Sequence, residues 1–133
     1  MNTKDIRNAL KARLAGGAVA SEAWPNVDAD SSVRPRIETT FAGVSQTGGT
    51  LKGNEVHYED GTFMAMAVVD KGDGEAAGLD LADDVAALFP EGLRLTITGG
   101  TVTIMARPDI RAGYPTETDY RIPVAIRYRA RNT

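Results

Sequence analysis

The feature that most restricts the fold is an apolar run, Phe63–Val69, which no polar residue interrupts. Asp60-Gly61 precedes the run, and the glycine-rich, charged segment 70–74 follows it. An uninterrupted apolar run of this length predicts a central β-strand that is covered on both faces. The next residues predict a helix that ends at Pro90 and can cover one face. The rest of the chain offers little further helix, which favours a partner molecule on the second face.

Two helices are predicted from the spacing of apolar side chains. The first extends from Thr3, which can cap it, to about Ala15. The second follows Gly74, and its apolar stripe is formed by Leu81, Val85 and Leu88. Its opposite side carries three aspartates that we expect to face solvent: Asp80, Asp83 and Asp84.

Strands are predicted where polar and apolar residues alternate, over 36–41 and over 120–128. In the second of these segments, Pro123 and a row of arginines are typical of a sheet edge or a bulge. With two hairpins between the segments, the sequence predicts a single α+β domain over residues 1–133. Its expected sheet is mostly antiparallel (mixed), with about five strands and two helices packed on one face.

Each hairpin is predicted from a pair of turn residues. If Asp60-Gly61 forms a two-residue turn, Tyr58 faces Phe63 across the first hairpin. If Gly99-Gly100 forms the second turn, Ile97 faces Val102, and both glycines are expected at positive φ.

Between the first strand and the first hairpin, the segment 42–54 is predicted to be a loop. Irregular segments of this length in a compact domain are usually functional or disordered. The segment is therefore our candidate for a mobile arm, and its glycines are Gly43, Gly48, Gly49 and Gly53.

Catalytic and metal-binding chemistry find little support in the sequence. The chain has no cysteine and one histidine, His57, in a predicted strand next to Glu59 and Asp60. A general base or metal site there would need a second imidazole or a converging carboxylate cluster, and the sequence shows neither. We therefore expect no enzyme activity, no cofactor and no bound metal. The first residues lack the apolar core of a signal peptide and no run reaches membrane-spanning length. We therefore expect the protein to work in an intracellular, reducing space or to be released from one, with no membrane partner.

Charge is strongly segregated along the chain, although the net charge is only −3. Residues 54–91 hold ten acidic side chains and one lysine, whereas residues 106–133 hold six arginines and three acidic side chains. The acidic total and the lack of aromatic residues among the arginines disfavour direct nucleic-acid binding. Two interpretations remain open: ordinary solvated faces, or a subunit whose acidic surface meets a basic surface of its neighbour.

Over nearly its whole length, the chain resembles the tail terminator, or tail completion, proteins of bacteriophages and prophages. The resemblance lies in the order and spacing of an N-terminal helix and five further segments: Ala23-Trp24-Pro25-Asn26, Pro35-Arg36-Ile37-Glu38, Gly61-Thr62-Phe63, the helix 81–90 and the ending 120–128. Glycine-bearing arms such as 42–54 vary in this family, so the resemblance implies nothing about that segment.

The resemblance implies a structural subunit that forms a ring, commonly a hexamer, and has no enzyme activity. Such a ring caps the tail tube, stops its polymerisation and offers a surface to the head-side connector. The implied location is the head-proximal end of the virion tail, with assembly in the host cytoplasm. A head–tail connector or minor tail protein would have a similar composition, and a monomer with a closed apolar pocket would instead favour a small-molecule-binding domain.

The arginines of the last strand are our candidate contact residues for another subunit or for the tube. Arg127, Arg129 and Arg131 alternate along one face of the predicted strand. We expect them to face acidic residues of a partner, since residues 54–91 hold a large acidic excess. The helical aspartates Asp80, Asp83 and Asp84 in that range are further candidate contact residues. The competing interpretation is that the same charges meet within one subunit.

Overall fold

The computed structural model describes residues 2–17, 21–23, 36–47 and 57–132, which form two helices and one mixed sheet. The helices are α1 (Thr3–Gly17) and α2 (Gly74–Ala87), and a short 3-10 helix (Lys71–Asp73) precedes α2. The strands are β1 (Ser21–Ala23), β2 (Arg36–Thr47), β3 (Tyr58–Asp70), β4 (Arg94–Ile97), β5 (Gly100–Ile104), β6 (Asp109–Ile110), β7 (Tyr114–Pro115) and β8 (Asp119–Asn132).

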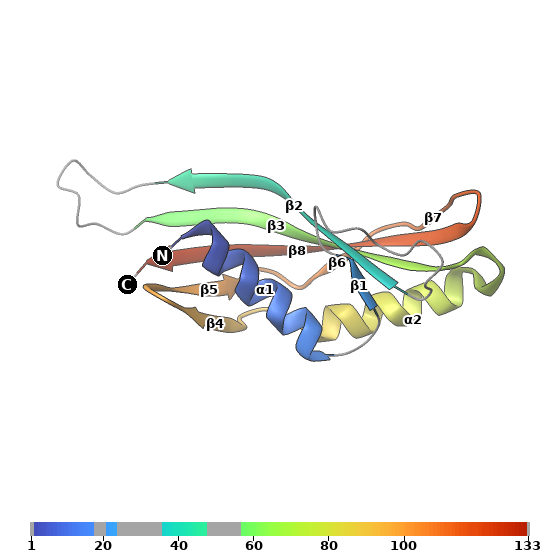
Figure 1. The fold of residues 1–133 in the computed structure, drawn as a ribbon, viewed down its shortest axis with the longest axis horizontal. Coiled ribbons are helices and arrows are strands. Elements are labelled where there is room, and N and C mark those ends of the chain that lie inside the picture. Colours follow the sequence, from blue (N-terminus) through green and yellow to red (C-terminus); the bar gives the residue numbers. More distant parts are fainter. Residues whose placement is uncertain (1, 18–20, 24–35, 48–56, 133) are drawn as a thin grey trace.

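The strands lie in the order β1-β2-β3-β8-β5-β4, and β6 and β7 pair with β8 further along the edge that β5 occupies. All pairs are antiparallel except β1 with β2, so the predicted α+β class is confirmed. The sheet has more strands than the expected five because three of the eight are only two or three residues long. Both helices pack on one side of the sheet (Figure 1), which we call the inner face. The opposite side is the outer face.

The core lies between the helices and the inner face. Alternate residues of β3, from Phe63 to Val69, and of β8, from Ile122 to Tyr128, point into it and are buried. Ile6, Leu10 and Leu14 of α1 complete the layer together with Leu81, Ala82 and Val85 of α2. On the outer face of β3, Met64 and Met66 are only half-buried. The apolar run is therefore a central strand, as predicted, but its two faces are covered unequally.

Helix α1 begins with a different cap from the one predicted. The side-chain oxygen of Asn2 accepts a hydrogen bond from the Asp5 backbone N–H at 2.8 Å, as an N-cap residue does. The hydroxyl of Thr3 instead donates to the Glu59 carboxylate at 3.2 Å. The predicted Thr3 cap is therefore wrong by one residue, and Thr3 joins α1 to β3.

The predicted turn at Asp60-Gly61 is wrong. Both residues lie inside β3, where they pair with Arg129 and Tyr128 of β8. A Cβ atom on Gly61 would lie 2.7 Å from the Tyr128 hydroxyl oxygen. The glycine is thus required by the close approach of a tyrosine ring from the neighbouring strand and not by a reversal of the chain.

The prediction that β8 lies at a sheet edge is also wrong. Strand β8 pairs with β3 along one side and with β5, β6 and β7 along the other. The Arg111 backbone N–H donates to the Pro123 carbonyl at 2.9 Å, on the side of β6 and β7. Because the N–H and C=O of a strand residue point the same way, the missing donor of Pro123 faces the break between those two short strands. Its absence therefore costs no ladder bond with β3.

The predicted loop 42–54 is in part a strand. Residues 42–47 continue β2, and the register with β3 shifts between Ala42 and Ser45. Gly43 has a φ of 60°, so Gly43 and Val44 form a bulge opposite Gly61. The bulge reverses the alternation of β2 and turns Gln46 to the same face as Glu59. Gly48, Gly49 and Gly53 lie outside the described residues, so mobility of the arm stays a prediction.

The second hairpin is confirmed, but its turn lies one residue earlier than predicted. Ile97 pairs with Gly100 and Leu95 pairs with Val102, so the two turn residues are Thr98 and Gly99. Gly99 has a φ of 76°, whereas Gly100 lies in β5 without positive φ. Every cross-strand partner thus moves by two residues, which leaves each side chain on its predicted face.

We expect the Gly99→Ala substitution to lower the free energy of unfolding by about 1 kcal/mol, because a Cβ atom strains a backbone with positive φ. Gly72→Ala is the matched control, since Gly72 has no atom within 4 Å of an added Cβ and no positive φ. Urea unfolding of both variants checks the assignment. Equal stabilities would contradict the Thr98-Gly99 turn.

Candidate functional site

A cluster of four charged residues covers one end of the outer face. The Arg36 guanidinium contacts Glu38 at 3.2 Å and Asp119 at 3.7 Å, and Arg121 binds the same two carboxylates. Arg36 and Asp119 are almost fully buried, and Val68 is fully buried between their strands. The sequence reasoning missed this cluster because its members come from two strands separated by some 80 residues. Its charges pair with one another, so it offers no free charge to a ligand, and loss of one member would leave a buried charge unpaired.

The three candidate arginines lie on the outer face at the other end of β8. Arg127, Arg129 and Arg131 are all exposed, as the alternation of the sequence predicted. Arg129 is already engaged: its guanidinium binds Asp60 through two hydrogen bonds, of 2.7 and 3.2 Å, and lies 4.9 Å from the centre of the Tyr58 ring. Part of the row is therefore paired within the subunit, as the competing interpretation held.

The candidate aspartates lie on the other layer of the domain. Asp80, Asp83 and Asp84 are exposed on the side of α2 that points away from the sheet, since Leu81, Ala82 and Val85 face the core. The structure therefore places the aspartates and the arginine row on opposite faces of one subunit and does not bring them together.

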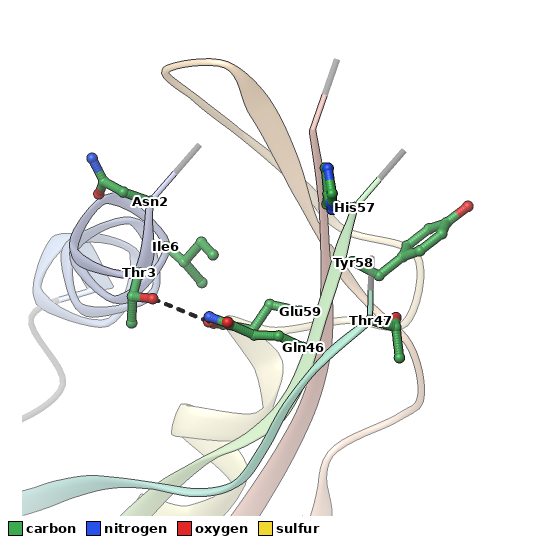
Figure 2. Close-up of a pocket in the computed structure, with 8 residues that line it drawn as sticks. All are labelled: Asn2, Thr3, Ile6, Gln46, Thr47, His57, Tyr58 and Glu59. Atoms are coloured by element: carbon green, nitrogen blue, oxygen red, sulfur yellow. Dashed lines mark hydrogen bonds between the residues drawn. The ribbon is translucent and has the colours of Figure 1, made fainter. Parts of the chain in front are cut away.

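A hollow of about 450 Å³ opens where the start of α1 meets the end of β2, at Gln46 and Thr47, and the start of β3, at Tyr58 and Glu59. Figure 2 shows Thr3 and Ile6 of α1 facing Gln46 and Glu59 of the sheet, with the Tyr58 ring directed away from the helix. Glu59 is 2% exposed, an unusual position for a carboxylate. No sequence motif predicted that Glu59 would be buried.

Three side chains donate hydrogen bonds to the buried Glu59 carboxylate. Thr3 and Gln46 bind one oxygen at 3.2 and 3.1 Å, and the Tyr128 hydroxyl binds the other at 3.1 Å. Burial, followed by the nearby charge of Glu59 and the hydrogen bond to it, raises the pKa of Tyr128 well above its ordinary value. The carboxylate therefore joins α1, β2, β3 and β8 at the base of the arm.

We expect the stability of the wild type to fall relative to Tyr128→Phe when the pH rises above about 10, the ordinary pKa of tyrosine. The folded state keeps the phenol proton where the unfolded chain loses it, so proton loss favours unfolding by up to about 1.4 kcal/mol per pH unit. Urea unfolding of both proteins between pH 8 and 11 measures the difference. A difference that stays constant over this range would contradict the environment assigned to Tyr128.

Within the described residues, no group of three or more His, Cys, Asp or Glu side chains is placed to hold a metal ion. His57 is exposed just before β3, and its backbone N–H donates to the Asn132 side chain at 2.6 Å. None of the described helices combines the length and the apolar character needed to cross a membrane.

Comparison with known proteins matches the chain to a family and to a fold. A solved structure with 22% sequence identity has a TM-score of 0.76, over 98% of this chain and 96% of that one. At this identity the likeness shows the fold alone. No curated protein matches the chain.

The family model for phage tail terminator proteins matches residues 5–128. Three of the segments that carried the resemblance, 61–63, 81–90 and 120–128, lie in β3, in α2 with the turn after it, and in β8. The segment 23–26 falls almost wholly outside the described residues. Because the match covers nearly the whole sequence, this chain belongs to the phage tail terminator protein family.

Proposed function

We propose that this protein is a structural subunit that forms a hexameric ring on the end of the phage tail tube. The ring stops polymerisation of the tube protein and offers the surface to which the head-side connector binds. The protein would then lie at the head-proximal end of the virion tail, after assembly in the host cytoplasm, and would have no enzyme activity. The observation that carries this proposal is the match to the tail terminator family over residues 5–128.

The outer face of the sheet supports an assembled state. Both described helices pack on the inner face, and no described helix covers Met64 and Met66 on the outer face. These methionines lie beside Pro123 and Ala125 of β8 and beside Glu38 and Thr40 of β2, so an apolar strip on β3 and β8 borders polar residues of β2. A half-buried apolar strip on a small domain favours contact with another protein surface.

The arm gives a second argument for assembly. Residues 42–47 of β2 are exposed, and among the described strands they pair only with β3. An exposed strand edge is a ready site for backbone hydrogen bonds with another chain. Its bulge at Gly43 limits unwanted pairing, as bulges at sheet edges do.

Two measurements test the proposal. Native mass spectrometry across a range of protein concentrations should show a closed oligomer of six subunits. In phage production without the protein, tails should be longer than normal and free of heads, and expression of the wild type should restore tails of fixed length. Tails of normal length that fail only to join heads would contradict the terminator function and favour a connector.

A further inference from the structure

The outer face of β4, β5 and β8 forms a basic surface, of which the sequence revealed only the arginines of the last strand. Strand pairing places Arg94 opposite Thr103, Thr103 opposite Arg129, and Arg129 opposite Asp60, in one line across four strands. The next line places Thr96, Thr101 and Arg131 together. Arg94 thus joins Arg129 and Arg131 of β8, although it lies 33 positions before Arg127, the first arginine of the predicted row.

Three of these arginines have charge available for a partner. Within the described part of the chain, no carboxylate forms an ion pair with Arg94, Arg127 or Arg131, whereas Arg129 is held by Asp60. Two hollows open beside them. One, of about 290 Å³, is lined by Arg94 and Arg131, and the other, of about 340 Å³, is lined by Arg127 and Met105. Met105 is 46% exposed, so this basic surface also contains an apolar contact point.

The exposed side of α2 has the complementary composition. Asp80, Asp83 and Asp84 are exposed there, and Leu79, one helical turn before Asp83, is 37% exposed. No ion pair joins these aspartates to a basic side chain of the described residues. An acidic surface with one apolar side chain therefore lies on the inner layer, and a basic surface with one apolar side chain lies on the outer layer.

We propose that the acidic side of α2 in one subunit binds the basic outer surface of a second copy, around Arg94, Arg127 and Arg131. The two surfaces lie on opposite faces of the domain, so they cannot meet within one chain. Contact between different surfaces of identical subunits is head-to-tail, and a head-to-tail contact closes into a ring when its rotation allows. This inference rests on the proposed function and names the contact that would join neighbouring subunits.

Phosphate groups of a nucleic acid are the other partner that arginines and threonines on a sheet could bind. The second-copy partner is favoured because the chain itself carries the matching acidic surface and a net charge of −3. Charge complementarity at such an interface acts on both specificity and association rate. Binding of duplex DNA is therefore included as an outcome of the test.

Two charge-reversal variants test the contact. The basic-surface variant carries Arg94→Glu, Arg127→Glu and Arg131→Glu and leaves the Arg129–Asp60 pair intact. The acidic-surface variant carries Asp80→Lys, Asp83→Lys and Asp84→Lys. We expect each variant alone to associate at least about tenfold more weakly than the wild type in sedimentation experiments. An equimolar mixture should associate again, because the reversed surface of each variant then faces an opposite charge.

A matched control reverses the same number of exposed charges elsewhere: Lys4→Glu, Lys71→Glu and Arg111→Glu. It should associate like the wild type, and circular dichroism should show that all variants are folded. Wild-type association in the two surface variants, or equal weakening in the control, would overturn this contact and leave the ring itself standing. A wild type that stays monomeric at every concentration would overturn the ring and the contact together. Loss of duplex DNA binding with unchanged self-association in the basic-surface variant would overturn the contact in favour of a nucleic acid.

Discussion

Replacing Phe63 with alanine is expected to lower the free energy of unfolding by about 3–5 kcal/mol, the usual range for truncating a buried phenylalanine. The ring is fully buried at the centre of the inner face. It stacks on Phe41 of β2 with ring centres 5.0 Å apart, and it meets the edge of Phe89, which follows α2, at 5.9 Å. The truncation therefore removes contacts to both neighbours and leaves a cavity at the centre of the core.

The matched control for this prediction is Phe41→Ala. Phe41 belongs to the same aromatic group but is only half-buried, with the Arg7 guanidinium 4.7 Å from its ring centre. Its loss should cost roughly half as much, because less apolar surface returns to water. Urea unfolding at one fixed protein concentration measures both variants, since association adds to apparent stability. A cost for Phe63→Ala no greater than that for Phe41→Ala would contradict the central position of Phe63.

The Gly61→Ala substitution is expected to cost about 2 kcal/mol, a large effect for one added methyl group. The new Cβ atom would lie 2.7 Å from the Tyr128 hydroxyl oxygen and 3.0 Å from the ring carbon that bears it. The ring must move, and its hydrogen bond to the buried Glu59 carboxylate is then lost. A hydrogen bond to a charged group contributes about 1.5–3 kcal/mol, which sets the size of the effect.

Gly43→Ala provides a control on the opposite strand. Gly43 has no atom within 4 Å of an added Cβ, so only its positive φ opposes the substitution, at about 1–2 kcal/mol. Repeating both substitutions in the Tyr128→Phe variant distinguishes the causes of their costs. In Tyr128→Phe the closest atom is absent, so Gly61→Ala should cost less there, whereas the cost of Gly43→Ala should not change. Equal costs of Gly61→Ala in both backgrounds would contradict the role assigned to Tyr128.

The hydrogen bonds of Glu59 also fix the first part of the arm, residues 42–47, to the rest of the domain. Its three donors come from the start of α1, from β2 beyond the bulge and from β8, so movement of any one of these elements disturbs the other two. A fully hydrogen-bonded buried carboxylate fixes local geometry because an unpaired one is very costly. The base of the arm is therefore held firmly to the body of the domain.

The spacing of apolar residues in the sequence was enough to predict which side of each main helix and strand is buried. The helical spacing in α1 and α2 and the alternation in β8 identified the buried side chains, because burial of apolar surface drives both patterns. The alternation in β8 predicted the exposure of Arg127, Arg129 and Arg131, and the helical spacing in α2 predicted that of its aspartates. The faces of the β4–β5 hairpin were also correct, since a register shift of two residues preserves them.

Only the tertiary structure decided how these elements meet. Asp60-Gly61 has the composition of a turn, yet both residues lie within a strand. Position 61 needs a glycine because the Tyr128 side chain passes over it to reach Glu59. Pro123 suggested an edge strand, yet β8 is central. It tolerates the proline because β6 and β7 leave a gap opposite the missing N–H. Arg94 joins the arginines of β8 only through the pairing of three strands. Such contacts join residues distant in the chain, and no local pattern of the sequence encodes them.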